Sequence, residues 1–240
     1  MAVVTLNGSI GSGGHDVGVL TARLLNADYV DRLILAEAAK RIGSSVEVLA
    51  LKEERSIQLR DRIAYFFQTM LERSAMSGAG GEPYFSPGME YLPSEEYIDL
   101  AQEPVTAAQR LNDQHFIDGT SAVIKDLAKA GDVVIIGRGS NMILRDMPGV
   151  LHVGVTASLE ARTRIIMERE HLSEKDAEKY VSNLEKARVK FYRKFFNVHP
   201  DDPSLYQLIL NVDAIDAEAA AEVLALAAEK LTSKVAMETP

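Results

Sequence analysis

The sequence predicts an α/β fold in which helices cover both faces of an open, parallel sheet. Two observations predict this class: strands alternate with helices along the chain, and most of the strands are continuously apolar, as in Val133–Ile136. Continuously apolar strands are typical of parallel sheets buried on both faces, and the intervening helices supply the crossovers that parallel strands need. A third observation, a glycine-rich loop between the first strand and the first helix, indicates where a ligand would bind.

The N-terminal part of the chain begins with an apolar strand over Ala2–Leu6, and a periodic helix follows the glycine loop to about Leu25. Tyr29–Arg32 is a short extended segment. Periodic apolar residues and end signals predict three further helices: Leu33–Arg41, a helix capped by Ser44, and Arg60–Ser74. Glycine and proline gather over residues 75–104, which predicts a long loop that is either a substrate cover or a surface insertion.

The C-terminal part returns to alternating helices and strands. Ser173 with Asp176 three residues later is a cap that begins one of the helices. The tail from Thr232 to Pro240 is predicted to fray. The predicted elements are Thr106–Lys129 (helix), Val133–Ile136 and Val150–Val155 (strands), Leu159–Glu170 and Ser173–Phe196 (helices), Leu208–Val212 (strand) and Asp216–Leu231 (helix).

Composition limits the function classes. The chain has 240 residues, no cysteine and a net charge of −9. An acidic protein of this kind is not expected to bind nucleic acid or a membrane surface, because both require a basic face. Without cysteine there is no disulfide or thiolate chemistry, and with no targeting segment or membrane-spanning run the expected location is the cytoplasm.

The glycine loop has part of a phosphate-binding pattern. Gly8 and Gly13 have the G-x-x-x-x-G spacing of a P-loop, in which glycines let several backbone N–H groups converge on one anion. Gly14 stands where a P-loop has lysine, and His15 where it has the serine or threonine that holds magnesium. The sequence therefore predicts a phosphate cradle that lacks two groups used in phosphoryl transfer.

Further candidate residues follow the strands at the edge where ligands of such sheets bind. Asp31 and Arg32 follow the second extended segment, and Arg138 follows a buried strand between two glycines. A surface role is unnatural for Arg138 in that position, so it is the strongest of the candidates. Asp31 and Asp146 are candidate acid, base or metal-shell groups.

Four other arginines lie on two consecutive helices. Arg162 and Arg169 share one face of the first helix, and Arg188 and Arg193 lie on the second. The planar guanidinium fork suits phosphate oxygens. Glutamates on the first helix offer the alternative that its arginines belong to a solvated, salt-bridged face.

Three groups of segments together resemble the cytidylate kinase-like family, a branch of the P-loop nucleoside monophosphate kinases. The resemblance covers most of the chain except residues 43–115. The matching segments are Gly11–Gly14 with Tyr29–Arg32; Val134–Asn141 with Leu144–Asp146 and Val150–Val153; and Ala157–Arg162, Met167–Arg169, Lys186–Arg188, Phe191–Arg193 and Asp202–Leu208 with Asn211.

The resemblance implies a single P-loop domain of three α/β/α layers with a five-stranded parallel sheet. Its parts would be a core (1–42, 116–158 and 205–231), an acceptor-side helical insertion (43–115) and a helical lid (159–204). It further implies ATP-dependent phosphoryl transfer to a nucleoside monophosphate, with CMP or dCMP as the expected acceptor and Mg²⁺ as the metal. The partners would then be small nucleotides.

The resemblance also assigns roles to residues. Those expected to bind the ATP phosphates are Gly8, Gly11, Ser12, Gly13, Gly14, His15 and Arg169; those expected to bind the acceptor are Asp31, Arg32 and Arg138; and those expected to act in catalysis are Arg138, Arg162, Arg188 and Arg193. No metal ligand is assigned.

The chain departs from the better-characterised cytidylate kinases at two positions. Those have lysine after the second loop glycine, where Gly14 stands here, and aspartate after the arginine that matches Arg138, where Gly139 stands here. In this subgroup a basic residue commonly follows the loop, and here it is His15, whose charge depends on pH. Two alternatives therefore stay open: a nucleotide-binding sensor or scaffold with impaired catalysis, and a kinase of another small metabolite.

Overall fold

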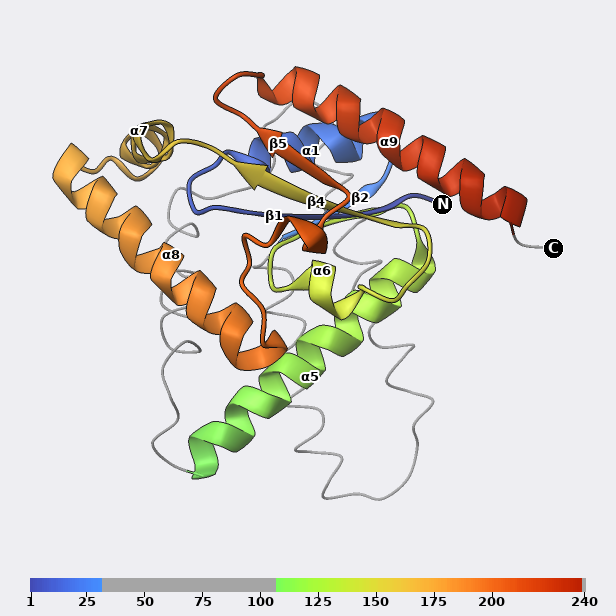
Figure 1. Ribbon diagram of the computed structural model, residues 1–240, viewed down its shortest axis with the longest axis horizontal. Helices are drawn as coiled ribbons and strands as arrows, with labels where there is room; N and C mark the ends of the chain where they lie inside the picture. Colours follow the sequence, from blue (N-terminus) through green and yellow to red (C-terminus); the bar gives the residue numbers. More distant parts are fainter. Residues whose placement is uncertain (32–106, 239–240) are drawn as a thin grey trace, which may run out of the picture.

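The computed structural model describes the backbone of residues 1–31 and 107–238, and the side chains of residues 1–31 and 117–234 (Figure 1). The predicted helices between Leu33 and Ser74, the loop over residues 75–104 and Arg32 lie outside the described residues. No helix in the described parts of the chain is long and apolar enough to cross a membrane.

Five parallel strands form one sheet in the order β2-β3-β1-β4-β5, as the fold class predicts (Figure 1). The central strand β1 pairs with β3 on one side, where Val4 faces Val134, and with β4 on the other, where Val4 faces Leu151. The strands are β1 (Val3–Gly8), β2 (Asp28–Val30), β3 (Val133–Ile136), β4 (Val150–Thr156) and β5 (Leu208–Asn211). The predicted strand positions are therefore confirmed to within two residues.

Helices cover both faces of the sheet and also stand beside it. In Figure 1, α1 and α9 lie over one face, α5 and α6 lie over the other, and α7 and α8 stand at the end of the sheet where β1 and β4 finish. The helices are α1 (Gly14–Leu24), α5 (Ala107–Ala130), α6 (Ser140–Ile143), α7 (Leu159–Glu170), α8 (Glu174–Phe196) and α9 (Ala217–Glu238), with a 3-10 turn η1 (Pro203–Leu205) before β5.

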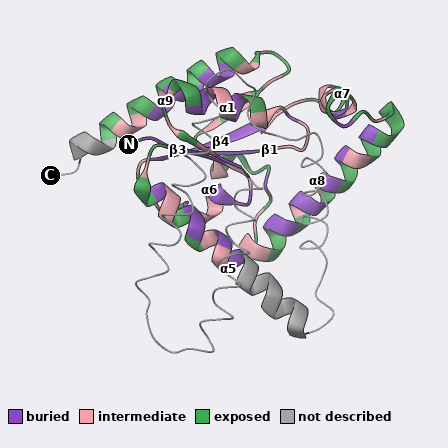
Figure 2. Ribbon diagram, turned by 180° about the vertical axis from the view of Figure 1, so that it is seen from behind, coloured by how far each residue is buried: buried purple, intermediate pink, exposed green. Residues whose placement is uncertain are grey.

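Alternate side chains of β1 lie on opposite faces of the sheet and belong to two separate hydrophobic clusters. Val4 and Leu6 pack with α1 and α9, for example against Leu224. Val3 points to the other face and packs with Val123 of α5. The purple, buried residues in Figure 2 accordingly run through the sheet between the helical layers. Burial on both faces explains why the strands are mostly apolar, and why their polar residues such as Thr5, Asn7 and His152 are hydrogen-bonded.

The helices agree with the sequence prediction at the start of α8 and differ from it at the end of α9 and at α6. Ser173 caps α8 by accepting a hydrogen bond from the N–H of Asp176, as predicted. The prediction that the chain frays from Thr232 is wrong, because α9 continues to Glu238 and the hydroxyl of Thr232 bonds back to the carbonyl of Ala228 at 2.9 Å. The short helix α6 was not predicted, since its four residues carry no periodic pattern.

A buried histidine in the sheet makes stability depend on pH. His152 of β4 is 5% exposed, and its Nδ1 lies 2.8 Å from the hydroxyl of Thr5. Burial lowers the pKa of the imidazole to about 4, from 6.5, and outweighs the hydrogen bond to the backbone of Leu144, which raises it. The folded protein therefore holds this ring neutral at pH values where the unfolded chain already binds a proton.

We expect this group to contribute stability fully above pH 6.5 and to lose it progressively as the pH falls toward 4. The shift corresponds to about 3 kcal/mol, as an order of magnitude. Urea unfolding at pH 7 and pH 4 should show this loss in the native protein and a smaller loss in His152→Gln. The control is His171→Asn at an exposed position whose φ of 53° asparagine tolerates. Equal losses in the native protein and His152→Gln would contradict the assignment.

Candidate nucleotide phosphate site

The glycine loop faces a pocket at the carboxyl end of β1. Loop residues from Gly8 to Asp16 line one side, and side chains of α7 and α8 line the other. The helical side includes Ile165, Arg169 and Glu170 of α7 and Tyr180, Leu184, Arg188 and Tyr192 of α8. The pocket thus lies between a loop rich in backbone donors and a pair of helices that carry basic and aromatic side chains.

Close approach of the backbone explains the glycines. A Cβ at Gly8 would lie 2.4 Å from the carbonyl oxygen of Val155, and one at Gly11 would lie 2.9 Å from the carbonyl oxygen of Arg162. Gly11 and Gly13 also have φ values of 80° and 69°, in the left-handed region that favours glycine. By contrast, a Cβ at Gly14 would meet only the Cβ of Val155, at 4.0 Å.

The loop leaves several donors open. The N–H groups of Ser9 and Ser12 donate to the carbonyls of Val155 and Ser9. Within the described parts of the chain, the N–H groups of Gly11, Gly13 and Gly14 donate to no protein acceptor. Open N–H groups at the start of a helix, together with its dipole, form a site for an anion. The loop therefore offers the open donors expected of an anion site, and its role as a phosphate cradle stays a prediction.

The predicted arginines divide into two sets. Arg169 and Arg188 line the pocket. Arg138 is 1% exposed with a φ of 53°, Arg162 has 15% of its side chain exposed, and Arg193 is exposed on the last turn of α8. None of these last three is among the residues that line the pocket, so their predicted catalytic roles stay predictions.

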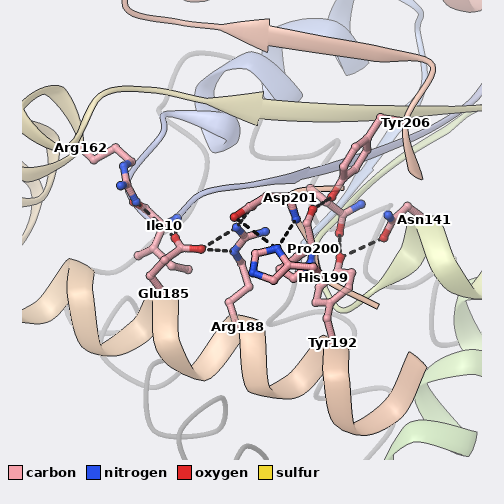
Figure 3. A network of polar contacts seen from close by, with 11 residues as sticks. Ile10, Asn141, Arg162, Glu185, Arg188, Tyr192, His199, Pro200, Asp201 and Tyr206 are labelled. Carbon is pink, nitrogen blue, oxygen red and sulfur yellow. Dashed lines mark hydrogen bonds and ion pairs between the residues drawn. The ribbon is translucent and has the colours of Figure 1, made fainter. Parts of the chain in front are cut away.

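Two acidic residues hold the arginines in place (Figure 3). Arg188 donates from Nε to Glu185 Oε1 at 2.6 Å and from Nη2 to Asp201. Burial alone would lower the pKa of the Arg188 guanidinium, but the charges of Glu185 and Asp201 outweigh it and raise that pKa above its ordinary value. Arg162 donates to Glu185 Oε2 at 3.3 Å. The side chain of Arg188 thus stays charged although it is buried.

A second network joins β1, α6 and α8 at the pocket, where Asn7 and Tyr192 belong to the lining. The hydroxyl of Tyr192 lies 3.0 Å from Asn7 Oδ1 and 2.9 Å from Asn141 Oδ1 (Figure 3), and it donates its single proton to one of them at a time. Nearby, the hydroxyl of Tyr206 donates to the carbonyl of Pro200 at 2.6 Å, and burial raises the pKa of Tyr206 to about 12. Tyr206 is therefore a neutral hydrogen-bonding group.

His15 is held against β2. Its Nδ1 lies 2.6 Å from the hydroxyl of Tyr29, and the two rings meet edge to face at 5.5 Å. One turn further along α1, a Cβ at Gly18 would lie 2.3 Å from Ile136 Cδ1 and 3.2 Å from Tyr29 Cε2, so α1 lies very close to the sheet at this point. This close packing places His15 at the pocket beside Gly14.

The carboxylates of the pocket suit a magnesium ion that is bound together with nucleotide phosphates. Asp16 and Asp31 both line the pocket, and Asp31 is 7% exposed. Among the side chains described, those of residues 1–31 and 117–234, no group of three or more histidine and acidic residues could hold a metal ion. Magnesium bound with nucleotide phosphates needs only one or two carboxylates, so either aspartate could serve. Arg32, the other predicted acceptor-side residue, lies outside the described residues.

Sequence reasoning did not find several residues of this site. Glu185, between Leu184 and Lys186 in a charged helix, has the pattern of a solvated residue. Asp201 lies between the predicted helix that ends at Phe196 and the predicted strand that begins at Leu208, where no element was expected. Asn7 is a polar residue in a buried strand, and Tyr192 lies on the buried face of the charged helix α8. For Asn7 and Tyr192 a signal did exist: a polar side chain in a buried strand or on a buried helix face needs a partner.

Comparison with known proteins agrees with this arrangement. The chain is 26% identical to the cytidylate kinase of Methanopyrus kandleri over 118 residues, or 46% of this chain, and 30% identical to that of Methanocaldococcus jannaschii over 108 residues, or 44% of this chain. These matches span 61% of the length of each relative.

The fold also matches a solved structure, and the sequence matches a family. A crystal structure of an uncharacterized protein from Eubacterium ventriosum superposes with a TM-score of 0.61 at 18% identity, covering 95% of this chain and 98% of that one. At that identity the likeness shows the fold alone. Residues 3–214 match the cytidylate kinase-like family. With its five-stranded parallel sheet covered by helices on both faces, this chain belongs to the cytidylate kinase-like family.

Proposed function

We propose that the protein transfers the γ-phosphoryl group of ATP to a nucleoside monophosphate, with CMP or dCMP as the acceptor. The observation that carries the proposal is a pocket lined both by Gly11, Gly13 and Gly14, whose N–H groups are open, and by Arg169 and Arg188. Phosphoryl transfer needs little more from a protein than positioned phosphates and well-placed positive charge. Membership of the cytidylate kinase-like family supports the choice of substrates.

In the proposed reaction an oxygen of the acceptor phosphate attacks the γ-phosphorus in line. A new P–O bond forms as the bond to the bridging β,γ-oxygen breaks, and ADP leaves. The open N–H groups of Gly11, Gly13 and Gly14 hold the donor phosphates, and Asp31, Arg32 and Arg138 orient the acceptor. Magnesium, when bound with ATP at Asp16 or Asp31, would neutralise phosphate charge.

We propose that the arginines of α7 and α8 stabilise the negative charge that develops on the phosphate oxygens during transfer. Arg169 and Arg188 line the pocket, which supports a contact between their guanidinium groups and phosphate oxygens. Arg162 and Arg193 lie outside its lining, and we propose that they approach only when nucleotides are bound. Together these groups take the place of the missing lysine at Gly14.

A coupled assay tests the proposal. It measures ADP formation with ATP, magnesium and each of CMP, dCMP, UMP, AMP and GMP in turn. We expect turnover with CMP or dCMP well above that with the purine monophosphates. No turnover above background with any of these acceptors would contradict the proposal.

A nucleotide-binding sensor with impaired catalysis is the second candidate. It is favoured by the pairing of Arg162 and Arg188 with Glu185 and Asp201, because the positive charges of these arginines are already balanced by carboxylates of the protein itself. A sensor should bind ATP or CMP without transfer, and it should keep that affinity when Arg162 or Arg188 is replaced.

Restoring the lysine separates the two candidates. A side chain at position 14 has open space, so Gly14→Lys should fold without strain. If the arginines already supply the charge, we expect Gly14→Lys to change turnover by less than about tenfold. A sensor would instead show turnover only in this variant. Gly14→Met is the control for side-chain length without charge, and the coupled assay with CMP and dCMP is the measurement.

A further inference from the structure

Both backbone groups of Ile10 are held by side chains of α7 and α8. The N–H of Ile10 donates to Glu185 Oε2 at 2.9 Å, and its carbonyl accepts a hydrogen bond from Arg162 Nη1 at 3.5 Å. Arg162 Nη1 also donates to the same Glu185 oxygen at 3.3 Å (Figure 3). The ion pair between α7 and α8 is thus hydrogen-bonded to the backbone of the loop at the residue immediately before Gly11.

The other oxygen of the same carboxylate faces the pocket arginine. Glu185 Oε1 accepts a hydrogen bond from Arg188 Nε at 2.6 Å, and Arg188 is 4% exposed and lines the pocket. Glu185 itself is not among the described residues that line the pocket. A single carboxylate therefore touches both halves of the phosphate site, the glycine loop and the basic helix, without facing the ligand.

We propose that Glu185 is a positioning residue that fixes the glycine loop and the Arg188 guanidinium relative to each other. The inference rests on the proposed function in that the loop must hold phosphates. The four charged groups bonded here, Arg162, Glu185, Arg188 and Asp201, balance to zero, so the cluster stabilises the arrangement without adding net charge next to the cradle.

The direction of the change in anion affinity distinguishes a positioning role of Glu185 from a simple effect of its charge. Removing a carboxylate near an anion site should by itself strengthen anion binding, because a repulsive charge is lost. If Glu185 acts by positioning, its removal should weaken anion binding instead, since the loop N–H groups and Arg188 lose their fixed geometry.

Isothermal titration calorimetry with inorganic tripolyphosphate at fixed ionic strength measures whether the affinity rises or falls. We expect binding that is several-fold weaker in Glu185→Gln, which keeps an oxygen for the Ile10 N–H, and about tenfold weaker or more in Glu185→Ala. The matched control is Glu178→Gln, an exposed position on the same helix with the same change of charge, which should bind at least as tightly as the native protein. Native-like or tighter binding in both Glu185 variants would overturn the proposal.

Amide hydrogen exchange at Ile10, followed by NMR, tests the positioning without any ligand. We expect this N–H to exchange about tenfold faster in Glu185→Ala, while Val4 inside β1 stays protected and reports that the fold is intact. Unchanged exchange at Ile10 would overturn the proposal whatever the titration shows. If the native protein failed to bind tripolyphosphate, the proposed function would be contradicted, and the Ile10 exchange rate would still decide the role of Glu185.

Discussion

Replacing Arg188 with methionine is expected to reduce phosphoryl transfer by about 10²–10³-fold. Arg188 is a buried arginine of the pocket lining with bonds to both Glu185 and Asp201, so its loss removes a charge proposed to contact phosphate and leaves both acidic partners without it. Breaking such a pair should also cost about 3 kcal/mol of folding free energy, at the lower end of the range because the Asp201 side chain is 55% exposed.

The measurements are kcat/KM in the coupled assay, at a temperature where circular dichroism shows the variant folded, and urea unfolding. Arg188→Lys keeps the charge but has no planar fork with which to bond two carboxylates, so it should recover only part of the rate. Lys190→Gln, an exposed position on the same helix, is the control for the loss of a positive charge. A folded Arg188→Met variant with native kcat/KM would show that this arginine takes no part in transfer.

Adding one methyl group at Gly8 should weaken tripolyphosphate binding by about 10–100-fold. The new Cβ would lie 2.4 Å from the Val155 carbonyl and 2.9 Å from Ser12 Oγ, and a backbone oxygen of β4 cannot move aside without shifting the strand. The first turn of the loop must therefore move, and the open N–H groups move with it.

Gly14→Ala is the matched comparison, because the same methyl group enters open space there and the backbone N–H stays in place. Its loss of affinity should be much smaller than that of Gly8→Ala. Titration with tripolyphosphate measures both variants, and thermal unfolding reports their stability. Equal losses at the two positions would mean that the approach of Gly8 to β4 does not determine the shape of the cradle.

Local patterns were sufficient to predict the layers of the fold. Apolar runs such as Val133–Ile136 placed the strands, and the Ser173 cap placed the start of α8, because each depends on neighbours in sequence. Strand order depends instead on pairing between distant segments, so the position of β2 at the edge beside β3 could not be derived from composition. The extension of α9 was missed because hydroxyl groups of Thr232 and Ser233, which favour turns, here bond back to the helix.

The site was predicted less completely than the fold. The glycine loop could be found because its function requires a fixed spacing, and Asp31, Arg169 and Arg188 line the predicted pocket. Glu185 could not be found in this way, since a glutamate between a leucine and a lysine on a charged helix has the same appearance whether it is solvated or holds two arginines. Only the meeting of α7, α8 and the loop in space distinguishes the two cases.

The close packing at Gly18 makes the candidate phosphate site depend on a residue outside the glycine loop. Residues three apart share one face of a helix, so the contact of Gly18 with Ile136 and Tyr29 also determines how near His15 lies to the Tyr29 hydroxyl. A side chain at this position would act as a wedge beneath α1 and would tilt the first turn, with its N–H groups, away from β3. Affinity for phosphate would then depend on a residue that touches neither the ligand nor the loop.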